Sequence, residues 1–184
     1  MTRRAAVSAV LVLLVEGWLY YRYAQLDAQF HFWLHALLGG ALGLAALTAL
    51  RLALPARLAR RAPSGTAPWA AGLAGHAYSA LPDLLFLGFG VLHMLWMDVF
   101  AFHITIHFIP APLVTMLVVF LLTLLGHGLA MSRRRVLAVV SLVVAGAVLV
   151  AALAMADPIP THIHDLLVDR GLALCPVDHT STQH

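Results

Sequence analysis

Residues 113–131 read LVTMLVVFLLTLLGHGLAM and residues 136–156 read VLAVVSLVVAGAVLVAALAMA, with a short segment containing three arginines between them. Neither run contains Asp, Glu, Lys or Arg. A helix of about 20 apolar residues is long enough to cross the hydrocarbon core of a bilayer. The two runs therefore predict a pair of transmembrane helices joined by a short basic loop.

The composition of the whole chain agrees with this prediction. Of its 184 residues, 62% are hydrophobic and 10% are charged, and the mean hydropathy is +0.91. Soluble domains carry roughly 25% charged residues. A cytosolic enzyme, a nucleic-acid-binding protein and a disordered chain are therefore excluded. The single cysteine, Cys175, has no partner for an intramolecular disulfide.

Three more apolar runs, at residues 5–21, 32–54 and 67–86, bring the expected number of spans to five. We expect an all-α integral membrane protein in which a surface helix at 92–108 ends before Pro110 and Pro112. Residues 157–184 are polar and are expected to form an extracytoplasmic tail. The third span has an alternative, because residues 84–103 are also apolar enough to cross. We favour 67–86, since a loop rich in Gly and Pro precedes it.

The distribution of arginines predicts the orientation. Nine of them fall on one side of a five-span topology, and the positive-inside rule makes that side cytoplasmic. These are Arg3, Arg4, Arg51, Arg57, Arg60, Arg61, Arg133, Arg134 and Arg135. We therefore expect the N-terminus inside, the C-terminus outside, and a multi-pass protein of a bacterial-type plasma (inner) membrane. The oligomeric state is not predicted.

With this topology, most ionisable side chains gather in the outer half of the membrane. Such groups are costly in lipid and usually serve a function. Imidazoles and carboxylates are the usual protein ligands of zinc, iron and manganese, and two histidines one helical turn apart can bind the same ion. The predicted metal ligands are His31, His35, His76, Asp83, Asp98, His103 and His107, and Glu16 or His93 is the predicted general base or ligand-orienting group.

This number of ligands exceeds what one tetrahedral ion needs and suits two ions bridged by a carboxylate and a water. We expect zinc, with manganese or iron as alternatives. The expected activity is metal-assisted hydrolysis of an ester or phosphoester in a lipid that reaches the site from the bilayer. His127 lies near the opposite membrane surface, and we interpret it as structural.

Three short motifs resemble the membrane-bound metal-dependent hydrolase family. The segment from Phe30 to His35 is similar to its F-H-x-x-x-H stretch, and the segment from His76 to Asp83 is similar to its His followed by Leu-Pro-Asp. His93 with Asp98 resembles the third element. The resemblance implies metal ligands at these positions and a hydrolytic activity. The chain departs from the family pattern at Ala36 and Leu85 and in the order of the motifs.

Two other functions remain open. His103 and His107, followed by Ala-Pro-Leu at 111–113, resemble the outer motif of membrane assembly factors that deliver copper to cytochrome oxidase. Met94 and Met97 offer softer ligands for copper. A copper- or zinc-binding chaperone or transporter is therefore an alternative. A non-covalent haem held by His35 and His76 on facing helices is another.

Overall fold

The computed structural model describes residues 3–53, 67–89 and 95–158, and every regular element in these ranges is a helix. The long helices are α1 (Arg3–Ala24), α2 (Gln29–Ala53), α6 (Pro112–Met131) and α7 (Arg135–Ala154), and the shorter elements are α4 (Ala67–Ser79), α5 (Leu81–Phe89), η1 (Leu95–Val99) and η2 (Thr105–His107). Residues 159–184, which hold most of the predicted tail and Cys175, lie outside the described residues.

The helices α1, α2, α6 and α7 are long and apolar enough to cross a membrane. They begin and end within a few residues of the predicted spans 5–21, 32–54, 113–131 and 136–156. Many apolar side chains point outward, including Leu14, Val136 and Val143. Such a surface is expected for helices that contact lipid rather than water.

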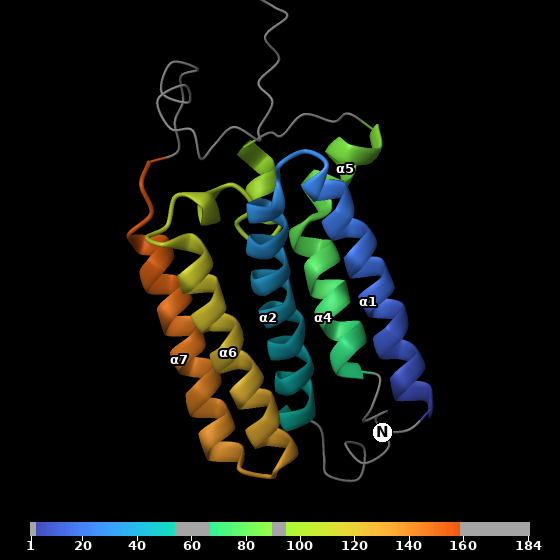
Figure 1. Ribbon diagram of the computed structural model, residues 1–184. Helices are drawn as coiled ribbons and strands as arrows, with labels where there is room; N and C mark the ends of the chain where they lie inside the picture. The colour runs from blue at the N-terminus through green and yellow to red at the C-terminus, as the bar shows by residue number, and fades with distance from the viewer. Residues whose placement is uncertain (1–2, 54–66, 90–94, 159–184) are drawn as a thin grey trace, which may run out of the picture.

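The predicted third span, residues 67–86, is not one continuous helix. It is divided at Ala80 into α4, of 13 residues, and α5, of 9 residues. Proline at the second position of α5, Pro82, has no N–H and its ring conflicts with the preceding helical turn, so a straight helix cannot continue through it. The two helices point in different directions in Figure 1. The described residues thus contain four helices that are long and apolar enough to cross a membrane, and the count of five spans stays a prediction.

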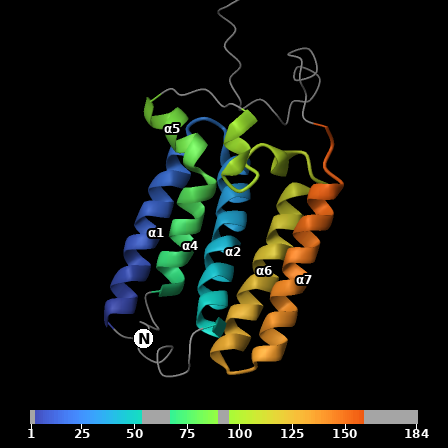
Figure 2. The same ribbon diagram turned by 180° about the vertical axis from the view of Figure 1, so that it is seen from behind.

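The five helices of the bundle lie side by side in the order α1, α4, α2, α6, α7 (Figures 1 and 2). The central helix α2 packs on α4 along one side and on α6 along the other, and α7 packs on α6. Leu34 and Leu38 of α2 meet Met116 and Val119 of α6 in the buried core. The helix α2 thus carries contacts to both halves of the bundle.

The two ends of the bundle differ in chemistry. The start of α1, the last turn of α2 and the α6–α7 connection lie at the same end (Figure 1) and carry Arg3, Arg51 and Arg133–Arg135. We call this the arginine end. The opposite end, formed by the start of α2, by α5 and by residues 95–111, contains the histidines discussed below, and we call it the histidine end.

The prediction of one surface helix at 92–108 is wrong over residues 95–108, the part of this segment that the structure describes. Residues 95–108 form two short 3₁₀ helices, η1 and η2, joined by a turn. Ala101 and Phe102 in this turn have φ angles of 57° and 56°. Such positive values are incompatible with a continuous right-handed helix. The segment folds back over the bundle as a compact loop.

Glycines allow α2 and α4 to approach until their backbones touch. A Cβ atom at Gly39 would collide with the backbone of Gly75, and one at Gly43 would collide with the carbonyl of Ala71. A four-residue spacing of glycines, as at Gly39 and Gly43, is typical of closely packed membrane helices. The structure identifies α4 as the partner helix, with Gly75 as the third small residue.

We predict that Gly43→Ala destabilises the protein by about 1–3 kcal/mol, because the added methyl group forces two helix backbones apart. Gly72→Ala on α4 is the matched control, since a Cβ at Gly72 meets nothing within 4 Å. The control should be neutral or stabilising, because alanine is the better helix former. Thermal unfolding in detergent measures both variants. Equal midpoints for Gly43→Ala and the wild type would contradict the proposed contact.

Candidate metal centre

The first two histidines of the site lie one helical turn apart at the start of α2. His31 and His35 share a face of the helix, with ring centroids 6.4 Å apart. Both are buried, and His35 is fully inaccessible to solvent. The start of α2 therefore presents two imidazoles to the interior of the histidine end.

The carboxylate of the site comes from the first turn of α5. Asp83 follows Pro82 directly after the break between α4 and α5, so the change of chain direction positions its side chain. Tyr23, near the end of α1, donates a 2.7 Å hydrogen bond from its hydroxyl group to Asp83 Oδ2. Both residues are buried. The helices α1 and α5 thus meet at this carboxylate.

The remaining two histidines are His103, in the turn between η1 and η2, and His107, the last residue of η2. Asp98 holds this loop closed, because its carboxylate accepts hydrogen bonds from the backbone N–H groups of Ile104 (2.8 Å) and Thr105 (2.9 Å). It also accepts one from the Thr105 hydroxyl group at 2.7 Å. The closed loop directs His103 and His107 toward α2. Asp98 thus organises the segment that carries these two histidines.

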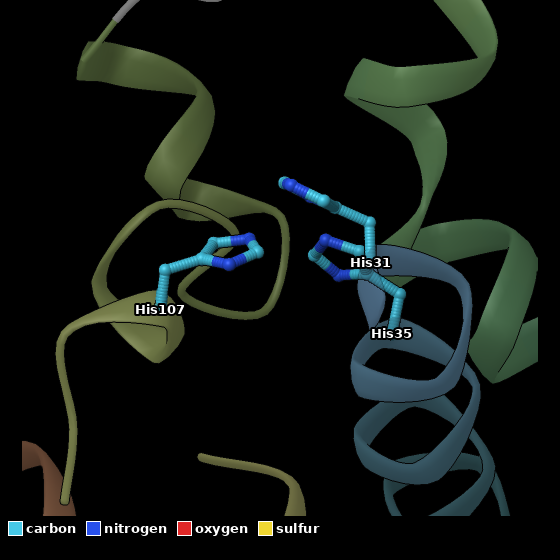
Figure 3. Close-up of side chains that lie close together, drawn as sticks. All are labelled: His31, His35 and His107. Carbon is cyan, nitrogen blue, oxygen red and sulfur yellow. The ribbon is translucent and has the colours of Figure 1, made fainter. Parts of the chain in front are cut away.

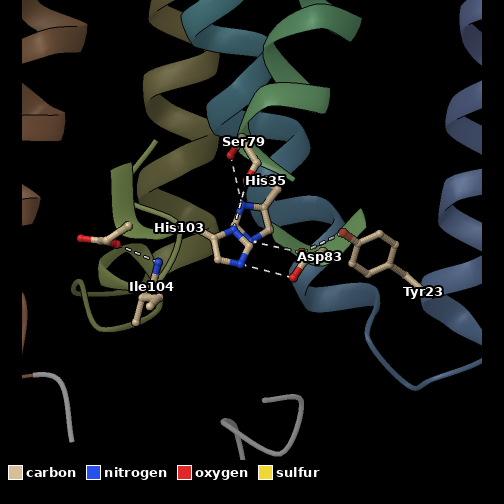
Figure 4. A network of polar contacts seen from close by, with 7 residues as sticks. Tyr23, His35, Ser79, Asp83, His103 and Ile104 are labelled. Atoms are coloured by element: carbon tan, nitrogen blue, oxygen red, sulfur yellow. Dashed lines mark hydrogen bonds and ion pairs between the residues drawn. The ribbon is translucent and has the colours of Figure 1, made fainter. Parts of the chain in front are cut away.

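Asp83 faces two imidazole nitrogens, and Tyr23 lies on its other side (Figure 4). The distance from Asp83 Oδ2 to His35 Nε2 is 3.6 Å, and that from Asp83 Oδ1 to His103 Nε2 is 3.3 Å. The rings of His35 and His103 stack with their centroids 4.2 Å apart and their planes 13° apart. Among the described residues, His35 Nε2 has no hydrogen-bond partner. Two imidazoles therefore face the two oxygens of one carboxylate.

A contact with Ser79 indicates which nitrogen of the neutral His103 ring carries the proton. His103 Nδ1 lies 3.0 Å from the backbone carbonyl oxygen of Ser79, which can only accept, so Nδ1 carries a proton. In the neutral ring, Nε2 is then an acceptor that faces the acceptor Asp83 Oδ1. A proton on either atom or a metal ion between them relieves this conflict. His35 Nδ1 lies 3.1 Å from the Ser79 hydroxyl oxygen.

A second group of side chains shares His35 with the group formed by His35, Asp83 and His103. His31, His35 and His107 each offer a nitrogen, and these three atoms lie within 4.8 Å of one another (Figure 3). The same limit holds for the ligand atoms of His35, Asp83 and His103. The rings of His31 and His107 are 4.3 Å apart between centroids. Because His35 belongs to both groups, the five side chains form one cluster, which we call the His/Asp cluster.

The dimensions of the cluster fit a metal ion. Zinc binds imidazole nitrogen at about 2.0–2.1 Å and carboxylate oxygen at about 2.0–2.2 Å, so two ligands of a tetrahedral ion lie about 3.4 Å apart. The separations of 3.3 and 3.6 Å from Asp83 are close to this value. Hydrogen bonds from Tyr23 and to Ser79 orient the ligands in the manner typical of metal sites. The His/Asp cluster could therefore hold a metal ion.

The structure separates the other predicted site residues from this cluster. His76 Nδ1 lies 2.7 Å from Glu16 Oε2, and neither residue belongs to the His/Asp cluster. Asp98 organises its own loop, as described above. His93 lies outside the described residues. No pattern in the sequence points to Tyr23 or Ser79, because a single tyrosine and a single serine near helix ends carry no spacing signal.

His127 lies away from the cluster, as expected for a structural residue. Its Nδ1 is 2.8 Å from the hydroxyl oxygen of Thr48, near the arginine end of α2 and α6. The hydroxyl group of Thr48 also donates to the carbonyl oxygen of Leu44. The histidine thus connects two helices.

Comparison with known proteins found no matching family model, no matching curated protein and no matching solved structure. The resemblance to the membrane-bound metal-dependent hydrolases therefore depends on the short motifs alone.

We predict that Tyr23→Phe lowers metal affinity about 10–100-fold, because it removes the hydrogen bond that orients Asp83. Tyr21→Phe is the matched control on the same helix, since the Tyr21 hydroxyl group contacts only the exposed Gln25 among the described contacts. Competition with a chromophoric chelator gives both affinities. If Tyr23→Phe binds zinc as tightly as the control, Tyr23 does not orient a ligand.

Proposed function

We propose that this chain is a membrane protein that binds one divalent metal ion, zinc by its donor set, through His35, Asp83 and His103. We further propose that it uses the ion to hydrolyse an ester or phosphoester of a lipid. The observation that carries the proposal is the Asp83 carboxylate facing two imidazole Nε2 atoms at 3.3 and 3.6 Å. The neutral tautomer of His103 places two acceptors against each other, and a bound cation resolves this conflict.

One ion is favoured over the two expected from the number of ligands. The two groups of ligand atoms share His35, whose Nδ1 already contacts Ser79. A neutral imidazole with one nitrogen so engaged offers a single ligand atom. His76 and Asp98 were expected to supply ligands to a second ion. His76 instead contacts Glu16, and Asp98 accepts a hydrogen bond from the backbone of Ile104.

Three protein ligands are typical of catalytic zinc sites, whereas structural sites use four. When bound, the ion would supply an activated water and stabilise negative charge on the reacting oxygen. His31 and His107 lie beside His35, and His107 is only partly buried. These two imidazoles are positioned to accept a proton from the nucleophile and to return one to the leaving group.

The location of the cluster supports a lipid substrate. It lies at one end of a bundle whose outer surface is apolar, and the ester and phosphoester groups of lipids lie near the ends of helices that span a bilayer. The arginine-rich opposite end supports the predicted orientation, in which the histidine end faces outward. A plasma membrane of bacterial type stays part of this proposal.

The geometry gives less support to a copper-binding chaperone or transporter and to a haem protein. The two groups of ligand atoms consist of imidazole nitrogens and a carboxylate oxygen, which suit zinc better than copper(I), and Met94 lies outside the described residues. A haem between His35 and His76 is not favoured either, because one face of the His35 ring stacks on His103. His76 is instead engaged with Glu16.

We predict that the purified protein retains about one equivalent of zinc and that Asp83→Asn retains less than a tenth of that. Loss of the carboxylate removes both charge and a ligand atom. Asp27→Asn is the matched control, because Asp27 is exposed in the α1–α2 turn and asparagine tolerates its positive φ of 55°. Elemental analysis after chelator-free purification measures all three proteins. Equal zinc in Asp83→Asn and the control would overturn the assignment.

We predict that His107→Gln keeps its zinc but lowers kcat for ester hydrolysis about 100-fold, within the range of general acid–base catalysis. The probes are p-nitrophenyl esters and bis-p-nitrophenyl phosphate in detergent micelles, followed by release of nitrophenolate. Activity should disappear with a chelator and return with zinc. A zinc-loaded wild type without activity on either probe or on phospholipid vesicles would contradict hydrolysis and leave metal binding standing.

A further inference from the structure

A groove of about 750 Å³ runs along the side of the bundle and is separate from the His/Asp cluster. It is lined by α1, α2, α4 and α6, and on α2 it uses Phe32, Ala36 and Gly40. At 100° per residue, the centre of these positions lies about 120° around α2 from the centre of His31 and His35. The groove and the metal centre therefore occupy different faces of the same helix.

The groove opens toward the membrane. Leu13, Tyr20, Trp33 and Trp69 line it and are between 38% and 60% exposed, although they are large and apolar or aromatic. Its volume falls within the range of about 300–1,000 Å³ that is typical of small-molecule sites. A molecule dissolved in the bilayer can therefore enter the groove without passing through water.

The wall of the groove contains a hydrogen-bonded acid–imidazole pair. His76 Nδ1 lies 2.7 Å from Glu16 Oε2, and both residues line the groove. His76 is only 1% exposed, and its Nε2 has no hydrogen-bond partner among the described residues. With Glu16 ionised, Nδ1–H donates to the carboxylate and Nε2 is left as an acceptor. A buried acceptor without a donor is costly, which points to a ligand that carries one.

The other residues of the wall narrow the chemistry of that ligand. Tyr20, Phe32, Trp33, Trp69 and Phe120 contribute aromatic rings, which pack well against another planar ring. Among the described residues of the groove there is no arginine, and the acid–imidazole pair carries a negative carboxylate. An anionic phospholipid headgroup would thus meet repulsion rather than a cation. A neutral aromatic headgroup with hydroxyl donors fits both features.

We propose that this groove binds an alkyl-substituted aromatic diol of the quinol class, with one hydroxyl group donating to His76 Nε2 and the alkyl chain lying among the apolar side chains. Glu16 orients His76 by accepting its Nδ1 proton. The site is independent of the metal centre and of the hydrolytic function proposed above.

The test measures binding of a decyl-substituted benzohydroquinone to the full-length protein in detergent micelles, by quenching of tryptophan fluorescence. Gly72→Leu fills the groove from α4, where an added Cβ meets nothing within 4 Å, and Gly17→Leu does the same from α1. Gly146→Leu on α7 is the matched control, because its position is equally open and does not line the groove. We expect each groove-filling variant to weaken binding at least tenfold and the control to bind like the wild type.

Glu16→Gln tests the polar end of the site and should weaken diol binding about tenfold without changing the zinc content. Decylbenzene, which has the same chain and ring but no hydroxyl groups, should bind at least tenfold more weakly than the diol. Equal binding of decylbenzene and the diol would show an apolar crevice without a specific headgroup site and would overturn the proposal. So would unchanged diol binding in both Gly72→Leu and Gly17→Leu, or stronger binding of phosphatidylglycerol than of the diol.

Discussion

The backbone contact between α2 and α4 is the constraint on which the rest of the structure depends. Helices normally pack 8–10 Å apart because side chains separate them, whereas Gly39 and Gly43 on α2 meet the backbone of α4 directly. The approach brings the end of α4 close enough for Ser79 to contact both His35 and His103. It also brings Asp83, just beyond Ser79, to the imidazoles. A looser interface would leave these polar groups without partners in an apolar environment.

Electrostatics then determines what the histidine end can hold. A buried carboxylate is costly unless cations or donors surround it, and Asp83 has the Tyr23 hydroxyl group on one oxygen and an imidazole near each oxygen. The hydrogen bond from His103 to the Ser79 carbonyl prevents the neutral ring from donating to Asp83 at the same time. A proton or a metal ion between His103 Nε2 and Asp83 Oδ1 relieves the contact between two acceptors. A divalent ion does so without requiring a protonated imidazole in the membrane.

Hydropathy was sufficient to predict the four long helices, because each is a continuous apolar run with few charges. All five residues of the His/Asp cluster were also predicted from the sequence as metal ligands, since ionisable groups are rare in lipid and their presence there indicates a function. The sequence did not predict the loop at 95–108, where the Asp98 carboxylate replaces helical hydrogen bonds with its own. Nor did it distinguish His76 from His35, because their different partners depend on how α1 packs against α4, which hydropathy does not encode.

The helix α2 lies between a polar environment, the His/Asp cluster, and an apolar one, the groove beside α1. One face carries His31 and His35, where several imidazoles and a carboxylate gather at the end of the bundle. The other face carries Phe32, Ala36 and Gly40, whose apolar or absent side chains leave space beside α1. Phe32 packs against His76 and Tyr23, with ring centroids 5.2 and 5.8 Å away. Because this aromatic ring lies between the Glu16–His76 pair and the tyrosine that orients Asp83, the two polar groups are kept apart, and each can bind its own ligand.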